Sequence, residues 1–433
     1  MSLSLPPEIE IKPRPAFDTR VRVPGSKSIS NRVLLLSALA DGRSSLRGLL
    51  DCDDTRVMVR ALSQLGATFE GEMADVVTVD GVAGRPEVPT LSTPLAIDVH
   101  ASGTAARFLT AALALVPAET VLDGTARMRE RPINDLVSAL VALGVDMTIE
   151  GQNGCPPIRC RGGRPFGGEV KVDASKSSQY VSALLQIAPF AALDVVLELK
   201  DGVLVSRPYV DVTLDVMRTF GASARFIDDR RLHVSCQEHY QGIHYVVEPD
   251  ASTAAYFFCA AAITGGRIRV EDLPGRSSQA DMGLLSVLEQ MGAQVQRTES
   301  SVTVQGPLNG VLQGVNVDMN SMPDAVLALA VTAAFASGPT HIRNVANLRI
   351  KETDRLQALE TELRKLGVDA HAESDALRIQ PGPLHGATIA TYDDHRMAMA
   401  FALAGLRVPG VIIRDPGCIS KSWPGYFDAF ARL

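Results

Sequence analysis

Residues 58–67 read Met-Val-Arg-Ala-Leu-Ser-Gln-Leu-Gly-Ala, and this phrase carries the pattern that decides the fold. Its Met, Ala and two Leu residues fall at positions i, i+3, i+4 and i+7, which predicts one apolar face of a helix. Gly66 comes directly after that face, where helices commonly end on a left-handed residue that glycine adopts without strain. The phrase therefore predicts the end of an amphipathic helix, and strand-like runs around a polar turn follow it.

The same ending recurs at a nearly constant interval along the whole chain. The glycines are Gly66, Gly144, Gly221, Gly292 and Gly367, spaced 78, 77, 71 and 75 residues apart. A second marker, small or hydroxylated residues before an apolar helix, recurs at Ser28, Ser102, Ser177, Ser252, Pro323 and His395. Such periodicity is the signature of a repeated structural unit, here a strand, a helix, a strand, a second helix and a hairpin.

Six such units could form a solenoid, a closed ring or two groups of three. The sixth unit stops at Leu433 without its hairpin, and strand-like residues 8–12 and 20–23 could supply the missing pair. We therefore predict an α/β protein of six repeated units of about 75 residues, grouped as two three-unit domains. The predicted domains are residues 25–248, and residues 1–24 together with 249–433.

Composition limits the possible functions. The chain has 433 residues, 46% of them hydrophobic and 21% charged, which is typical of a soluble globular protein. A formal net charge of −7 argues against a nucleic-acid coat or a membrane-surface binder, although it permits a local basic pocket. The six cysteines form neither a CxxC pair nor a Cys/His quartet, so we expect no disulfide and no zinc site. The N-terminal residues lack a targeting pattern, which predicts a cytoplasmic protein.

Several predicted helix starts carry charged residues that a simple cap does not need. A lone Ser or Thr before a helix is usually a cap, but helix N-termini also bind anions. Residues 24–32, Pro-Gly-Ser-Lys-Ser-Ile-Ser-Asn-Arg, open the first helix with two cations and do not match a Walker loop. Residues 127–131 alternate arginine with other residues, which suggests an extended basic segment. Lys351 and Arg355 lie four apart, as on one face of a helix.

Nine phrases together resemble one family. They are PGSKSISNR, SGTAAR, RMRERPI, SKSSQY, VSRPYVDVT, MPDA, NLRIKETDR, DDHRMAMA and KSWPGYF, in this order from residue 24 to residue 427. They resemble the 3-phosphoshikimate 1-carboxyvinyltransferase (EPSP synthase) family of enolpyruvyl transferases. The resemblance implies two α/β domains of three units each, one of them discontinuous, with the active site in the interdomain cleft.

The resemblance also implies a reaction. The carboxyvinyl group of phosphoenolpyruvate moves to the 5-hydroxyl of shikimate 3-phosphate, and phosphate is released, in the shikimate pathway of aromatic amino-acid biosynthesis. Neither a metal nor an organic cofactor is implied. The expected partners are these two small molecules, with no nucleic acid and no membrane, and the expected state is a monomer. Both substrates are multiply anionic, which would explain a basic pocket in an acidic protein.

Site residues follow from the matched phrases. The residues implied to bind phosphoenolpyruvate are Lys27, Gly103, Arg131, Gln179, Arg355, Arg396 and Lys421. Those implied to bind shikimate 3-phosphate are Lys27, Ser28, Arg32, Ser177, Ser178, Gln179, Ser206, Tyr209, Asp324, Asn347 and Lys351.

The catalytic residues implied are Asp324, Glu352 and Lys27. A base must remove the proton of the 5-hydroxyl group, and Asp324 resembles the family's residue for that task. An acid must protonate the methylene carbon of phosphoenolpyruvate. Both Glu352 and Lys27 are candidates for the acid, and the sequence leaves the choice open.

Two other functions share features of this sequence, and one stretch of the sequence departs from the family. UDP-N-acetylglucosamine enolpyruvyl transferases share the architecture, but typically carry Lys-Asn at the first helix and a loop cysteine, whereas this chain has Lys27-Ser28 and no cysteine in residues 125–132. A non-catalytic anion-binding repeat protein would need neither Asp324 nor Glu352. The departure is His100-Ala101, where members commonly show Gly-Asn. It puts in doubt the contact with phosphoenolpyruvate and with glyphosate, the family's inhibitor.

Overall fold

The computed structural model describes residues 5–86, 88 and 93–433, which form two compact units. Unit 1 comprises Met1–Pro24 and Glu248–Leu433, and unit 2 comprises Gly25–Val247. The second boundary lies one residue before the predicted one. Glu248 belongs to unit 1 because its carboxylate accepts hydrogen bonds from Ser277 Oγ at 2.6 Å and Gln279 Nε2 at 3.3 Å.

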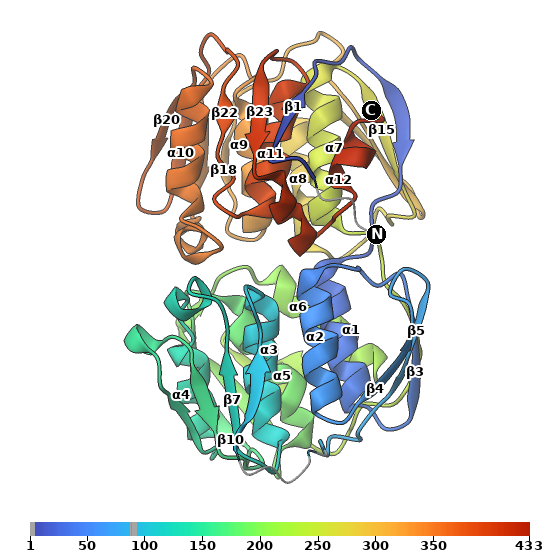
Figure 1. The fold of residues 1–433 in the computed structure, drawn as a ribbon, viewed down its shortest axis with the longest axis vertical. Coiled ribbons are helices and arrows are strands. Elements are labelled where there is room, and N and C mark those ends of the chain that lie inside the picture. The colour runs from blue at the N-terminus through green and yellow to red at the C-terminus, as the bar shows by residue number, and fades with distance from the viewer. Residues whose placement is uncertain (1–4, 87, 89–92) are drawn as a thin grey trace. The chain divides into compact units, whose positions relative to one another are not determined.

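Unit 2 contains three four-stranded sheets and three pairs of helices (Figure 1). The helices are α1 (Lys27–Leu39), α2 (Asp53–Gln64), α3 (Gly103–Ala112), α4 (Asn134–Ala142), α5 (Ser178–Ile187) and α6 (Pro208–Thr219). The strands are β3 (Arg43–Arg47), β4 (Thr68–Gly71), β5 (Val76–Asp80), β6 (Leu95–Asp98), β7 (Thr120–Asp123), β8 (Met147–Ile149), β9 (Ile158–Cys160), β10 (Gly168–Ala174), β11 (Val195–Leu204), β12 (Ala224–Phe226), β13 (Arg231–Val234) and β14 (His244–Val246). The sheet orders are β14-β3-β5-β4, β6-β7-β9-β8 and β10-β11-β13-β12.

Unit 1 repeats the same plan. Its helices are α7 (Ala251–Thr264), α8 (Leu284–Gln290), α9 (Val326–Ala333), α10 (Arg355–Lys365), α11 (His395–Gly405) and α12 (Tyr426–Phe430). Its strands are β1 (Glu8–Ile11), β2 (Asp18–Val21), β15 (Arg267–Glu271), β16 (Gln294–Arg297), β17 (Ser301–Gln305), β18 (Asn316–Asp318), β19 (Thr340–Arg343), β20 (Asp369–Ala372), β21 (Leu377–Gln380), β22 (Thr388–Ile389) and β23 (Val411–Arg414). The sheet orders are β2-β15-β17-β16, β18-β19-β21-β20 and β22-β23-β1.

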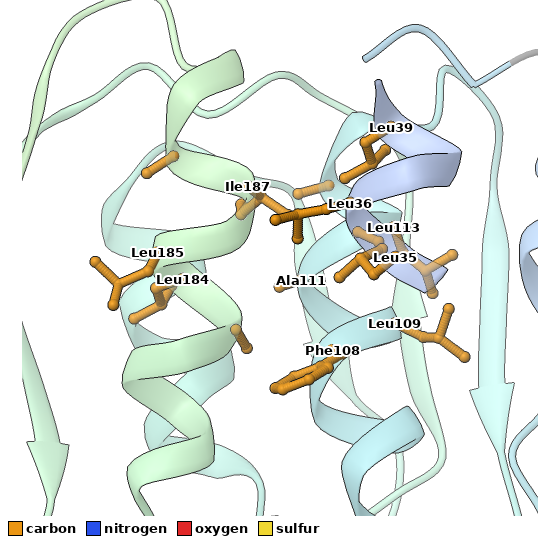
Figure 2. Close-up of a cluster of buried hydrophobic side chains, with 14 of the residues drawn as sticks. Leu35, Leu36, Leu39, Phe108, Leu109, Ala111, Leu113, Leu184, Leu185 and Ile187 are labelled. Carbon is orange, nitrogen blue, oxygen red and sulfur yellow. The ribbon is translucent and has the colours of Figure 1, made fainter. Parts of the chain in front are cut away.

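Three helices of each unit are buried on nearly every side, and they form its core. In unit 2 these are α1, α3 and α5, and Figure 2 shows aliphatic side chains of these helices, with Phe108, in one buried cluster. In unit 1 they are α7, α9 and α11, which are rich in alanine and therefore pack closely. The paired helices of unit 2, such as α2, have one buried and one exposed face.

The predicted helix ends are confirmed. All five recurring glycines have positive φ, between 91° and 100°, in the residue after a helix C-cap. Ser102 and Ser177 cap α3 and α5 as their positions suggested. In other units the cap is a neighbouring residue, since Asp250 caps α7 and Asp394 caps α11.

Both N-terminal strands pair within unit 1, as predicted, but the prediction that both complete the sixth repeat is wrong. Only β1 does so, by pairing antiparallel with β23. β2 pairs parallel with β15 of the fourth unit, although it precedes α1 of unit 2 in the sequence. Conversely, β14 precedes α7 of unit 1 but pairs parallel with β3 of unit 2. Each unit therefore takes one strand from the chain segment that leads into the other.

Three further findings concern the described residues only. No helix among them has the length and apolar character to cross a membrane. All six cysteines are free thiols. No group of three or more His, Cys, Asp or Glu side chains in the described ranges is arranged to hold a metal ion.

Candidate active site

The first turn of α1 holds Lys27 beside a buried carboxylate. Ser26 caps this helix, accepting a hydrogen bond from the backbone N–H of Ile29 at 3.5 Å. Nζ of Lys27 lies 3.3 Å from Oδ2 of Asp54, and these side chains are only 14% and 4% exposed. Asp54 begins α2 with Asp53 and was not predicted, because a carboxylate in the first turn of a helix is ordinary on dipole grounds.

Arg32 holds the backbone of two other predicted site residues, Ser28 and Tyr209. Its guanidinium donates to the backbone oxygens of Ser28 at 2.7 Å and Tyr209 at 2.9 Å. It also donates to Thr213 Oγ1 at 2.7 Å and lies over the ring of Phe108, 5.2 Å from its centroid. The residue is only 2% exposed, and burial lowers its pKa to about 10. The structure thus buries Arg32 in unit 2, where its hydrogen bonds fix the backbone of Ser28 and Tyr209.

Gly103 and Arg131 meet at the start of α3. A Cβ atom on Gly103 would lie 2.5 Å from Nη2 of Arg131, so only glycine lets the guanidinium approach the helix end this closely. The predicted extended basic segment around Arg131 is wrong. Residues Met128–Glu130 form a 3₁₀ turn, and two neighbouring arginines make surface pairs: Arg127 with Glu130 at 2.7 Å and Arg129 with Asp123.

The start of α5 lies next to the start of α3. Ser177 Oγ accepts a hydrogen bond from the backbone N–H of Gln179 at 3.2 Å, and Gln179 Nε2 donates to Thr104 Oγ1 at 3.2 Å. Ser178 is the first residue of the helix. Ser206 precedes α6 with a φ of 55°, which is uncommon for a residue with a side chain. The predicted residues of unit 2 thus gather at helix starts, and we call them the Lys27 cluster: Lys27, Ser28, Arg32, Gly103, Arg131, Ser177, Ser178, Gln179, Ser206 and Tyr209.

In unit 1 three cations surround one carboxylate. Oδ2 of Asp324 accepts a hydrogen bond from Arg396 Nη2 at 2.8 Å, and Oδ1 accepts one from Arg355 Nη1 at 3.2 Å. Nζ of Lys351 lies 3.9 Å from the same Oδ1. Asp324 is in a 3₁₀ turn, Pro323–Ala325, that leads into α9. Positive charges at this range favour an ionised carboxylate, the form that can accept a proton.

Glu352 joins the same network. Its Oε1 accepts a hydrogen bond from Lys421 Nζ at 3.0 Å, and its Oε2 lies 2.9 Å from Arg355 Nη2. Glu352 and Lys421 are 12% and 11% exposed, so their pairing is not a surface ion pair. We call the predicted residues of unit 1 the Asp324 cluster: Asp324, Asn347, Lys351, Glu352, Arg355, Arg396 and Lys421. Ion pairs connect all of them except Asn347, which lies buried in the 3₁₀ turn Ala346–Ile350.

Asp394 anchors this cluster from the core. Arg355 donates to it twice, from Nε at 2.7 Å and from Nη2 at 3.1 Å, and both side chains are buried. Burial acts to lower the pKa of Arg355, but Asp394 and Glu352 outweigh it and raise that pKa above its ordinary value. Asp394 also caps α11 by accepting from the N–H of Arg396 at 2.9 Å. Although its phrase was matched, Asp394 was not predicted as part of the site.

The spacing of Lys351 and Arg355 predicted that they share one face of a helix. This prediction is wrong. The 3₁₀ turn ends at Ile350 and α10 begins at Arg355, so Lys351 lies in the connection. Both residues nevertheless reach Asp324. The cluster with Asp394 brings four cations, Lys351, Arg355, Arg396 and Lys421, together with three carboxylates. It can therefore bind an anion and hold a base at the same place.

A second buried carboxyl group lies behind the Asp324 cluster. Asp281 accepts a hydrogen bond from Ser252 Oγ at the start of α7, and the Gly283 that follows it packs so closely that a Cβ there would lie 2.8 Å from Met322 Sδ. Burial, followed by the charge of Asp324, raises the pKa of Asp281 to about 6, while Arg396 opposes the shift. Asp250 adds a further negative charge nearby.

This shift predicts a pH-dependent stability. Between about pH 4 and 6 the native state keeps a proton on Asp281 that the unfolded chain has released, so stability falls as pH rises through this range. Asp281→Asn should remove that loss, on the order of 1–3 kcal/mol. The difference in melting temperature between variant and wild type is therefore expected to grow from pH 4 to 6 and then stay constant. A difference that does not change with pH would contradict this.

His100 and Ala101, which depart from the family's Gly-Asn, lie in a turn between β6 and α3. His100 has a φ of 46°, and its Nε2 lies 3.2 Å from Nη1 of Arg60 in α2. It lies beyond the end of β6 at Asp98, so its side-chain direction is set by a left-handed turn and not by strand alternation. Ser102 accepts a hydrogen bond from Ala105 N at 3.3 Å and so caps α3 without help from Ala101.

Comparisons with known proteins agree on one family. The sequence model of EPSP synthase (3-phosphoshikimate 1-carboxyvinyltransferase) matches residues 11–430. Curated proteins named 3-phosphoshikimate 1-carboxyvinyltransferase are 45% identical in Trichormus variabilis, over 96% of both chains, and 44% identical in Photobacterium profundum, over 98% of both.

Solved structures show the same architecture. An EPSP synthase from Acinetobacter baumannii superposes with a TM-score of 0.80 at 26% identity, over 98% of each chain. The enolpyruvyl transferase NikO from Streptomyces tendae has a TM-score of 0.78 at 19% identity, which supports the fold alone. The predicted α/β fold class is confirmed, and the UDP-N-acetylglucosamine alternative is not favoured. With the helix-start clusters in place and a match that runs nearly end to end, the chain belongs to the EPSP synthase (3-phosphoshikimate 1-carboxyvinyltransferase) family.

Proposed function

We propose that the Lys27 and Asp324 clusters together carry out the reaction of this family on one pair of substrates. The chain is a carboxyvinyl transferase of the shikimate pathway, and it transfers the carboxyvinyl group of phosphoenolpyruvate to the 5-hydroxyl of shikimate 3-phosphate. The observation that carries the proposal is Asp324, a carboxylate held among Arg355, Arg396 and Lys351. Such a group can accept a proton beside a bound anion.

The first step is an addition. Asp324 takes the proton of the 5-hydroxyl group, and the oxygen forms a bond to C2 of phosphoenolpyruvate. The C2–C3 double bond takes a proton at C3 from Glu352 or Lys27, which gives a tetrahedral ketal phosphate. In the second step the same groups act in reverse: the group that protonated C3, Glu352 or Lys27, takes a proton back from C3, the double bond re-forms, the bond from C2 to the phosphate oxygen breaks, and Asp324 returns its proton to the phosphate that leaves. Cations stabilise the phosphate that leaves.

Substrate binding is divided between the two clusters. We assign phosphoenolpyruvate to Lys27, Gly103, Arg131 and Gln179 in unit 2, and to Arg355, Arg396 and Lys421 in unit 1. Shikimate 3-phosphate is assigned to Lys27, Ser28, Ser177, Ser178, Gln179, Ser206 and Tyr209, with Asp324, Asn347 and Lys351. The burial of Arg32 supports an indirect role for it, through the backbone of Ser28 and Tyr209. Units 1 and 2 are in this proposal the two domains, and each contributes residues that bind both substrates.

Phosphorus NMR of a reaction mixture tests this proposal. With both substrates present, the phosphoenolpyruvate signal should convert into inorganic phosphate while the 3-phosphate ester stays intact. Omitting either substrate should abolish the conversion. Phosphate that forms from the 3-phosphate ester, or from phosphoenolpyruvate alone, would contradict a carboxyvinyl transfer.

Position 101 offers a test of the phosphoenolpyruvate assignment. The family commonly carries an amide there, and Ala101 adjoins the Ser102 cap and Gly103. If the amide would reach the ligand, Ala101→Asn should lower both the KM for phosphoenolpyruvate and the Ki for glyphosate by about 2- to 13-fold, the value of one hydrogen bond. If neither constant moves by more than about twofold, position 101 lies outside the site.

We further propose a cytoplasmic monomer that binds no nucleic acid. The net charge of −7 supports the absence of nucleic-acid binding, because it disfavours contact with phosphate backbones. Light scattering after gel filtration should give the mass of one chain. A mass of two chains would contradict the monomer.

A further inference from the structure

One backbone oxygen in unit 2 receives two buried side chains. Oη of Tyr180 donates to the carbonyl oxygen of Pro132 at 2.7 Å, and Nη2 of Arg107 donates to the same oxygen at 2.9 Å. Tyr180 comes from α5 and Arg107 from α3, so the two helices hold the same point of the chain. That point directly follows Arg131.

The same contacts extend to the helix start beneath the Arg131 guanidinium. Nη1 of Arg107 donates to the carbonyl oxygen of Gly103 at 3.2 Å and lies 3.7 Å from Met128 Sδ. Arg107 therefore ties Gly103 at the start of α3 to both ends of the segment 128–132. Met128–Glu130 form a 3₁₀ turn and none of the segment's residues lies in a strand, so these side-chain contacts add to the backbone hydrogen bonds that flank the segment, from Arg129 to Thr125 and from Ile133 to Gly154.

We propose that Tyr180 is a positioning residue for phosphoenolpyruvate: through Pro132 it fixes the main chain that carries Arg131. This inference rests on the proposed function, since it takes Arg131 as a phosphoenolpyruvate ligand. Tyr180 is only 1% exposed, so it acts without touching substrate. Burial raises the pKa of its phenol, which keeps the hydroxyl protonated and able to donate throughout the working pH range.

Loss of this hydroxyl should affect one substrate and not the other. Without it the Pro132 carbonyl loses one of its two side-chain donors and keeps Arg107, and the chain at Arg131 gains freedom that phosphoenolpyruvate must then restrict. Gln179, which precedes Tyr180, is held independently by Ser177 and Thr104. Shikimate 3-phosphate should therefore bind as before.

The unit contains a matched control. Tyr240 is also buried, at 0% exposure, and its Oη donates to the backbone oxygen of Gln186 at 2.8 Å. Tyr180→Phe and Tyr240→Phe each remove one buried hydroxyl that donates to a backbone carbonyl. Their effects on melting temperature should be similar, so that a difference in kinetics reports position and not stability.

Steady-state kinetics of the full chain decide the matter. Tyr180→Phe should raise the KM for phosphoenolpyruvate about three- to tenfold, with the KM for shikimate 3-phosphate within twofold of wild type, and Tyr240→Phe should change neither. In an Arg131→Lys background the effect of Tyr180→Phe should largely disappear, because both changes act on one contact.

Two results would overturn the inference while the function stands. One is equal KM values for phosphoenolpyruvate in the two tyrosine variants; the other is full additivity of Tyr180→Phe with Arg131→Lys. A wild-type protein that fails to turn over both substrates would instead refute the proposed function, and this inference with it.

Discussion

Replacing Asp324 with asparagine is expected to lower kcat by about 10²–10⁴-fold while shikimate 3-phosphate still binds. Asparagine has nearly the same size, but it has one acceptor oxygen, so it can keep the hydrogen bond from Arg355 or the one from Arg396 and not both, and it cannot take the proton of the 5-hydroxyl group. Attack on phosphoenolpyruvate would then start from a neutral hydroxyl. Pre-steady-state phosphate release and calorimetry with shikimate 3-phosphate measure the two quantities separately.

Asp318→Asn is a suitable control for this change. Asp318 is an exposed aspartate in the same unit, six residues earlier, and its carboxylate accepts from the backbone of Asn320 at 2.9 Å. This variant should keep the kcat of wild type. If kcat of Asp324→Asn stays within about threefold of wild type, Asp324 is not the base.

Of the substitutions that we propose, Asp394→Asn should produce the largest decrease in the free energy of unfolding. It leaves the buried guanidinium of Arg355 without the carboxylate that binds it twice, and breaking a buried pair from one side typically costs about 3–5 kcal/mol. Because Glu352 and Asp324 still contact Arg355, we expect the lower end of that range. Calorimetry should show the melting temperature of unit 1, taken as one cooperative unit, lower by about 6–12 °C.

Asp354 provides the comparison. It also caps a helix, α10, and pairs with an arginine, Arg349 at 2.7 Å, but its side chain is 40% exposed. Asp354→Asn should cost about 1 kcal/mol or less, because water screens such a pair. Equal losses for the two variants would show that burial of the Arg355 pair has no special weight.

The sequence predicted the repeat because its signals are local. A glycine after an apolar helical face, such as Gly66 or Gly292, predicts the end of the helix to within a few residues. Residues 18–21 and 244–246 were predicted in the units where they lie, but the strands that β2 and β14 pair with could not be predicted in this way. Both strands are short and precede a helix as their counterparts do, and their partners β15 and β3 lie about 200 residues or more away in the sequence.

The candidate site shows the same division. Matched phrases identified the residues at helix starts, and the structure gathers them into two clusters. The partners that hold them came only with the structure: Asp54 beside Lys27, Asp394 behind Arg355, and Tyr180 behind Arg131. Asp394 and Arg355 are 39 residues apart, so neither periodicity nor spacing links them.

One measurement tests the central claim most directly, namely phosphate release from phosphoenolpyruvate with two alternative acceptors. Wild-type protein is assayed with saturating phosphoenolpyruvate and either shikimate 3-phosphate or UDP-N-acetylglucosamine. The account predicts stoichiometric phosphate with shikimate 3-phosphate and none above background with UDP-N-acetylglucosamine. Phosphate release with UDP-N-acetylglucosamine would contradict it, and so would the absence of phosphate release with both acceptors.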